Sequence, residues 1–224
     1  MRIRPTVLAA LAAAALLAPA APSLATAAPK VAAAPPATVV TVVRPVDATG
    51  HARAGFAVAP ELSDHVDCSY ADPSVGAVDK NIESCSPSAA YVPACWKSAV
   101  AHTALCTRDP SKKKLVRVTY TGAFAATAAP KKAQRAPLLL VLLDGTRCSL
   151  RIGGAGAFYP GHPELYASYY CDHHGSVWAK DTAAHSGVNE TAASWTVRTA
   201  PSDGSGPLAV RHIKRAFFVG TFTG

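Results

Sequence analysis

LLLVLLDGTRCSLRI (residues 138–152) contains the clearest short-range fold signal in the chain. Six apolar residues precede Asp144-Gly145, and apolar and polar residues alternate after it. An Asp-Gly pair between two such runs predicts a β-hairpin, because a type I′ turn needs positive φ at both central residues. We therefore expect two antiparallel strands joined by a two-residue turn.

The expected turn also predicts which side chains share a face. It pairs Leu143 with Thr146 and Val141 with Cys148 toward the interior. The opposite face would carry an apolar strip bordered by arginines, made of Leu138, Leu140, Leu142, Arg147 and Arg151. Such strips are usually covered by another element. If it is open, the strip would suit an amphiphile with an acidic head or the carboxylates of a partner.

Other segments also favour β structure. Strands are predicted over residues 115–122, 167–171, 194–198 and 216–222, and TVVTVVRPV (38–46) reads as a β segment interrupted at Pro45. Residues 86–106 fit either a hairpin or a helix, because Val92, Cys95, Ala99 and Cys106 approximate one helical face. We expect a mainly β fold, a single disulfide-stapled antiparallel β domain. The alternative is α+β with one short helix.

The N-terminus is typical of a cleaved secretory signal. Arg2 and Arg4 form a charged region, residues 7–18 are 12 apolar residues, and Ala25-Thr26-Ala27 is a small-residue cleavage site. A membrane span needs roughly 20 apolar residues. We expect a signal peptide (1–27), an Ala/Pro-rich linker with one β segment (28–63) and the β domain (64–224). The mature protein would be secreted without a transmembrane span, or associated with the cell envelope.

Six cysteines follow the predicted cleavage site: Cys68, Cys85, Cys95, Cys106, Cys148 and Cys171. An even number behind a signal peptide predicts a disulfide framework, for which six cysteines allow fifteen connectivities. Near neighbours pair readily when hairpins return the chain. We therefore hypothesise three bridges, Cys68–Cys85, Cys95–Cys106 and Cys148–Cys171.

Basic residues are concentrated in the middle of the chain. Between Arg108 and Arg151 there are ten Lys or Arg residues and two acids, Asp109 and Asp144. Candidate binding residues are Lys112, Lys113, Lys114, Arg147 and Arg151. Such a patch favours an anionic envelope polymer or an acidic lipid, and outside the cell we expect no nucleic acid. Ordinary solubilising charge is an equally common explanation.

YYCDHHGSVW (169–178) holds the most chemically suggestive cluster. Asp172, His173 and His174 are consecutive, so their side chains would not converge on one ion, and Cys171 is assigned to a disulfide. The sequence contains no G-x-S-x-G motif, and GGAGAF (153–158) lacks the context of a phosphate or dinucleotide loop. We expect no metal, no cofactor and no catalytic residue.

Several motifs together resemble a known group of proteins. They are ACWKS, LCTRDP, PLLLVLLDGTRCSLRIGG, YYCD, WTVR and the terminal FVGT, spread over roughly residues 85–221. They resemble a family of uncharacterised secreted or lipid-anchored proteins of high-GC Gram-positive bacteria. This chain lacks the cysteine at the cleavage site that the lipid-anchored members carry. The resemblance implies export and disulfide pairing, and it implies no activity or functional residue.

Three classes of function fit these observations. The leading hypothesis is a secreted, non-catalytic binding domain that recognises anionic material at or near the cell envelope. One alternative is a secreted hydrolase that uses the Asp172/His173/His174 region. Another is an inhibitor or interaction protein with a protein partner, which presents a disulfide-held loop such as GAFYPGHPELY (156–166).

Overall fold

The structure is a computed structural model that describes residues 33–60, 66–68, 71–85, 92–124, 126–152, 157–180 and 186–224. The predicted signal peptide lies outside these residues. The chain divides into Met1–Ala34 and a compact unit, Pro35–Gly224. The described part is mainly β, and its only helical elements are the 3₁₀ turns η1 (Lys132–Gln134) and η2 (Asp172–His174). None of the described helices is long and apolar enough to span a bilayer.

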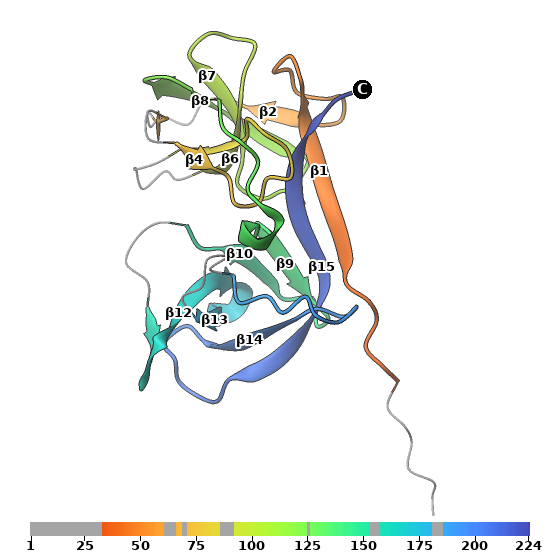
Figure 1. Cartoon of the computed structure of the whole chain (residues 1–224), viewed down its shortest axis with the longest axis vertical. Helices are drawn as coiled ribbons and strands as arrows, with labels where there is room; N and C mark the ends of the chain where they lie inside the picture. Colours follow the sequence, from red (N-terminus) through yellow and green to blue (C-terminus); the bar gives the residue numbers. More distant parts are fainter. Residues whose placement is uncertain are drawn as a thin grey trace, which may run out of the picture. The chain divides into compact units, whose positions relative to one another are not determined.

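Six antiparallel strands close into a barrel (Figure 1). They are β9 (Leu139–Leu142), β10 (Arg147–Leu150), β12 (His162–Cys171), β13 (Gly175–Lys180), β14 (Thr196–Pro201) and β15 (Ala209–Phe222). The hydrogen-bonded order is β15-β14-β13-β12-β10-β9, and β9 pairs with β15 again. Every strand contributes to the buried interior, which contains Leu140, Leu142, Cys148, Tyr169, Val177, Val197, Ile213, Ala216 and Phe218. The barrel interior is therefore a packed core.

The predicted hairpin forms between β9 and β10, but its loop has three residues, and the expected two-residue turn is wrong. The Leu142 amide donates to the Thr146 carbonyl, and the Gly145 amide donates to the Leu142 carbonyl. Gly145 has a φ of 90°, as in loops that join a type I turn to a bulge. The Asp144 carboxylate accepts from the Thr146 amide at 2.9 Å and stabilises this loop.

The longer loop shifts the hairpin register by one residue, which exchanges the two faces. Cys148 lies opposite Leu140, and Arg147 lies opposite Val141. Leu138, Leu140 and Leu142 are each no more than 3% exposed. The expected strip of leucines bordered by arginines is therefore wrong, because these leucines pack in the core and Arg147 points to the other face.

The segment expected to be a linker contributes a strand to the core. β1 (Val39–Asp47) pairs in parallel with β15, with Val43 opposite Val219. Val46 is fully buried. β15 is 14 residues long and extends beyond the barrel, so its second half needs a partner, which the β-branched valines of β1 provide. The expected domain start near residue 64 is wrong, as is a purely antiparallel arrangement.

The remaining strands form a second sheet. They are β2 (Ala57–Ala59), β3 (Val66–Asp67), β4 (Asp72–Pro73), β5 (Glu83–Cys85), β6 (Val92–Lys97), β7 (Thr103–Thr107) and β8 (Lys114–Thr121). β4 to β8 pair antiparallel in sequence order, and β2 and β3 pair in parallel with β8. Of residues 86–106, the structure describes 92–106, where β6 and β7 form a hairpin, so the helical alternative is wrong there. A short strand β11 (Phe158–Tyr159) pairs with β12.

Three disulfides staple the domain, and their pairings are those hypothesised from the sequence. Cys95–Cys106 joins β6 to β7, and Cys148–Cys171 joins β10 to β12. Cys68–Cys85 ties the chain after β3 to β5. The loops they close span 17, 11 and 23 residues, so each bridge contributes about 3 kcal/mol by loop-closure entropy.

A second apolar cluster joins the two sheets. Its buried members are Val46, Ala77, Ile82, Ala94, Trp96, Leu105, Leu115, Leu138 and Val219. They come from β1, β15, the second sheet, the connection between β4 and β5, and Leu138 directly before β9. β1 and β15 lie side by side in Figure 1. This cluster places Trp96 of the second sheet next to the carboxyl ends of β1 and β15, where a cavity opens.

Candidate functional site

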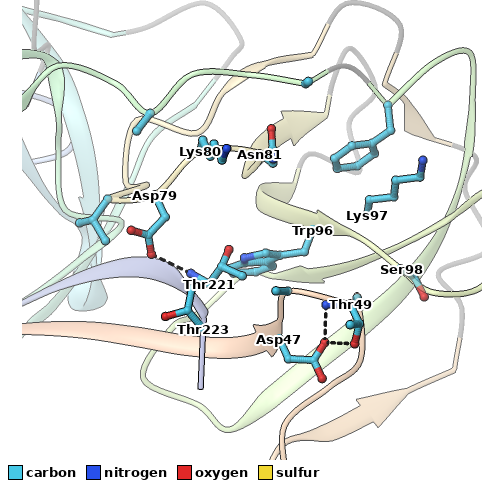
Figure 2. Close-up of a pocket in the computed structure, with 16 residues that line it drawn as sticks. Asp47, Thr49, Asp79, Lys80, Asn81, Trp96, Lys97, Ser98, Thr221 and Thr223 are labelled. Atoms are coloured by element: carbon cyan, nitrogen blue, oxygen red, sulfur yellow. Dashed lines mark hydrogen bonds between the residues drawn. The ribbon is translucent and has the colours of Figure 1, made fainter.

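The candidate site is a cavity of about 920 Å³. Because β1 and β15 are parallel, their carboxyl ends meet at one edge, and the end of β6 reaches the same place. Figure 2 shows the lining side chains, among them Asp47, Thr49, Asp79, Lys80, Asn81, Trp96, Lys97, Ser98, Phe124, Thr221 and Thr223. This volume lies in the range of pockets that hold small ligands.

One wall is held in place by the Asp79 carboxylate. It accepts from the Thr221 amide at 2.9 Å and lies 3.5 Å from the Arg44 guanidinium. Gly220 is required there for space, because a Cβ would lie 2.6 Å from the Asp79 oxygen. The charge of Asp79 is therefore already compensated by groups of the protein.

The opposite wall is a turn organised by Asp47. Its carboxylate accepts from the His51 amide. It also accepts from the amide and the hydroxyl of Thr49, as Figure 2 shows. These bonds, first the one from His51, lower the pKa of Asp47. Gly50 closes the turn with a φ of 86° and packs against the backbone of residues 97–99. Asp47 thus serves mainly to shape the wall.

Two lysines on the rim have no such compensation. Lys80 and Lys97 are exposed, and within the described chain neither side chain forms an ion pair or a hydrogen bond. Between the walls, the exposed side chain of Asn81 is also without a partner in the described residues. The cavity therefore presents two available ammonium groups and one amide, which favours an anionic ligand.

The buried floor carries an unsatisfied donor. Trp96 is 3% exposed, and its Nε1–H has no acceptor among the described residues. Figure 2 shows the indole between the walls, with its nitrogen on the side of Thr221. An unpaired buried donor costs about 1–3 kcal/mol. A ligand oxygen that reached this N–H would remove that cost, so Trp96 adds a directional donor to the two lysines.

The residues predicted from the basic segment lie elsewhere. Arg147 is half-buried and donates to the carboxylate of Asp109 at 2.8 Å and to the hydroxyl of Ser111 at 2.7 Å. Burial raises the pKa of Asp109, but hydrogen bonds from Ser111 and the Arg147 charge outweigh it and lower the value. Arg147 is therefore committed to an internal contact.

The other predicted binding residues are not brought together into one site. Lys112 lies 3.7 Å from the Asp109 carboxylate, while Lys113 and Lys114 are exposed and unpaired within the described residues. Arg151 is half-buried, and its amide donates to the Ser168 carbonyl. The lysines remain an exposed basic run, and no apolar floor lies under Arg147 and Arg151.

Asp172, His173 and His174 line a second cavity, of about 380 Å³, with Asp144, Thr146 and Arg211. Both histidines have a φ of 61°, so their side chains diverge from the regular strand path. Neither imidazole hydrogen-bonds to a described residue. No three His, Cys, Asp or Glu side chains in the described ranges are grouped to hold a metal ion.

Of the third candidate segment, residues 156–166, the structure describes 157–166, which form β11 and the start of β12. Phe158 is 63% exposed, and Gly161 turns the chain with a φ of 73°. Residues 153–156, which include part of GGAGAF, lie outside the described chain. The segment is an exposed hairpin, and the cavity residues are far from it in sequence.

Sequence reasoning missed Lys80, Asn81, Trp96 and Lys97. They stand on segments separated along the chain, and no local motif joins them. The parallel pairing of β1 with β15 creates the cavity, and that pairing was not predicted. Comparison of the chain with protein-family models, curated proteins and solved structures gives no match.

Proposed function

We propose that the protein is a secreted, non-catalytic binding protein that recognises anionic material at the cell envelope through the cavity of Lys80, Trp96 and Lys97. One observation carries the proposal: two ammonium groups and a buried indole N–H, all without a partner among the described residues, surround one cavity. Carboxylate and phosphate oxygens accept from both kinds of donor. The predicted signal peptide and the three disulfides support an extracellular place of action.

The exposed lysines outside the cavity have a separate role in this proposal. Lys112, Lys113 and Lys114 attract anionic polymers diffusely and raise their local concentration. Exposed charges are screened beyond about 8 Å at physiological ionic strength. A ligand bound in the cavity would itself shield its contacts with the two lysines from solvent, so these contacts should persist at higher salt.

The test is retention of the exported protein on isolated cell envelope across a salt series. Lys80→Ala/Lys97→Ala should weaken retention at all salt concentrations. The matched control, Lys113→Ala/Lys114→Ala, removes the same charge and should weaken retention only at low salt. Equal effects of both pairs would reduce the attraction to diffuse charge, and unchanged retention in both would end the proposal.

A third variant tests the directional donor. Trp96→Phe keeps an aromatic ring but removes the N–H, so it should weaken binding about tenfold, equivalent to about 1.4 kcal/mol. Polyglutamate and polyphosphate, used as defined probes, separate carboxylate from phosphate recognition. If Trp96→Phe binds both as the parent protein does, the cavity floor takes no part.

Each alternative function has one supporting observation. The second cavity gathers Asp172, His173 and His174 beside Thr146, which supports a hydrolase. No hydrogen bond there pairs a base with a nucleophile among the described residues. The exposed Phe158 on the β11–β12 hairpin supports an interaction protein. Hydrolysis abolished by His173→Ala, or a partner lost on Phe158→Ser, would replace the proposed function.

A further inference from the structure

A third cavity lies between β1, β15 and η1, and Val78 lines both this cavity and the Lys80–Trp96–Lys97 cavity. Its volume is about 380 Å³. We call it the Trp195 groove, and its lining consists of Val40, Val42, Val78, Lys132, Arg135, Glu190, Trp195 and Phe218. Five of these side chains are apolar and three are charged, so the groove combines a hydrophobic floor with an ionic rim.

The floor is an accessible extension of the barrel core. Val40 and Val42 point to one side because residues two apart share a face of a strand. Val42 lies opposite Phe218 of β15 and packs with Trp195 against the barrel interior. Val40 stays 48% exposed. A hydrocarbon chain laid on Val40 and Trp195 would continue the apolar packing that Phe218 begins.

The rim carries more positive than negative charge. Lys132 is exposed on η1, and Arg135 is held in place because its Nε donates to the Pro130 carbonyl at 2.9 Å. In the described chain, neither forms an ion pair with an acid. Glu190 is the single carboxylate among the described residues that line the groove. Its burial raises its pKa, and the Lys132 ammonium only partly offsets this shift.

We propose that the Trp195 groove binds a single-chain carboxylic acid, with the hydrocarbon chain on Val40 and Trp195 and the carboxylate between Lys132 and Arg135. The groove is of the size that holds one small ligand rather than a bilayer surface. Its charge matches an acidic head and opposes a cationic one. The sequence suggested an acidic amphiphile over Leu138, Leu140 and Leu142, but those leucines are buried and the matching chemistry lies here.

The first experiment titrates the exported protein, by calorimetry, with three probes of equal chain length: decanoate, decanol and decyltrimethylammonium. Decanoate should bind with one-to-one stoichiometry, decanol about tenfold more weakly, and the cation not measurably. Octanoate should bind about tenfold more weakly than decanoate, since each buried methylene contributes about 0.8 kcal/mol. Equal binding of the three head groups would overturn the proposal.

The second experiment uses variants with opposite expected signs. Lys132→Glu should weaken decanoate binding at least about tenfold, whereas Glu190→Gln should leave it unchanged or tighten it. Lys113→Glu, the matched control outside the groove, should have no effect. If Lys132→Glu and Lys113→Glu bind decanoate equally, the groove is not the site.

Two further results separate this proposal from its competitors. Lys80→Ala/Lys97→Ala should keep decanoate binding intact, so the two cavities are judged independently. Vesicles of anionic lipid should displace bound decanoate only to the extent that they release free carboxylic acid. Tight binding to such vesicles without binding of monomeric decanoate would refute a single-chain site.

Discussion

The barrel and the second sheet differ in how their strand edges are stabilised. The barrel closes on itself with strands of up to 14 residues and one disulfide. The second sheet stays open, includes strands of only two residues, and holds two disulfides. Closure satisfies the backbone of a barrel without further help, whereas short open strands need covalent support. We therefore expect the barrel and the second sheet to unfold separately.

The largest effect should come from removing both disulfides of the second sheet. Replacing Cys68, Cys85, Cys95 and Cys106 with serine should cost about 6 kcal/mol, twice the loop-closure contribution of one bridge. That is a large part of the stability of an ordinary domain. Cys148→Ser/Cys171→Ser should cost about 3 kcal/mol. Urea denaturation measures both losses.

Hydrogen exchange locates the damage in the four-serine variant. Amides of β5 to β8 should lose protection, while amides of β12 to β14 should keep most of theirs. Equal loss of protection in both regions would show that the barrel and the second sheet form one cooperative unit, which would contradict separate unfolding.

Next in size is a test of the hairpin register inside the barrel. Leu140 is fully buried, so Leu140→Ala should cost about 2–5 kcal/mol. Val141, on the other face, is half-buried, and Val141→Ala should cost about 1 kcal/mol. The register expected from a two-residue turn gives the opposite order. Denaturation midpoints of the two variants decide between the registers.

This hairpin shows how far local sequence could predict the fold. Alternation and the Asp144-Gly145 pair correctly indicated two antiparallel strands. The pair also fits a three-residue loop, and the bond from the Thr146 amide to Asp144 favours that loop. Because a one-residue shift reverses the faces, the expected register placed Leu140 on the face opposite Cys148, whereas both side chains pack in the same barrel core.

The candidate site could not be predicted from local sequence patterns, for a different reason. Lys80, Trp96 and Lys97 have ordinary neighbours in the sequence, and each also fits a plain surface or core position. They meet only because β1 pairs in parallel with β15, strands separated by most of the chain. The disulfide pairs were predictable because each closes a short loop between nearby strands.

A third prediction concerns an acid buried in the second sheet. Glu83 is fully buried on β5, and neither carboxylate oxygen has a hydrogen-bond partner among the described residues. Burial raises the pKa of Glu83 from 4.5 to about 7. The unfolded chain ionises first, so stability falls as the pH rises from about 4.5 to 7, by about 3 kcal/mol in total.

Glu83→Gln removes this titration without changing the side-chain volume. Relative to the parent protein, the variant should gain about 3 kcal/mol between pH 4 and pH 8, whatever its stability at pH 4. Thermal unfolding at the two pH values measures the difference. A difference near zero would mean that Glu83 is ionised and paired, and the second sheet would then lack this pH-dependent weakness.

The smallest expected effect on stability concerns two ion pairs that share the carboxylate of Asp109. Arg147 lies 2.8 Å from the Asp109 carboxylate with its side chain 35% exposed, whereas Lys112 lies 3.7 Å away and is 72% exposed. Arg147→Met keeps the apolar stem and should cost about 1 kcal/mol, and Lys112→Met should cost less than about 0.5 kcal/mol.

The dependence of the stability loss on salt and pH distinguishes the two ion pairs better than the size of the loss alone. In 1 M salt the loss in Lys112→Met should vanish, because the Debye length falls to about 3 Å, while part of the Arg147→Met loss persists. The pKa of Asp109 is lowered in the folded state, so its contribution is present above the ordinary value of 3.8 and is lost as the pH falls below it. Arg147→Met should therefore match the parent protein only in strong acid. If Arg147→Met loses as much stability in strong acid as at neutral pH, its effect comes from packing. The contact of Arg147 with Asp109, which joins the hairpin to the segment before β8, would then not stabilise the fold by electrostatics.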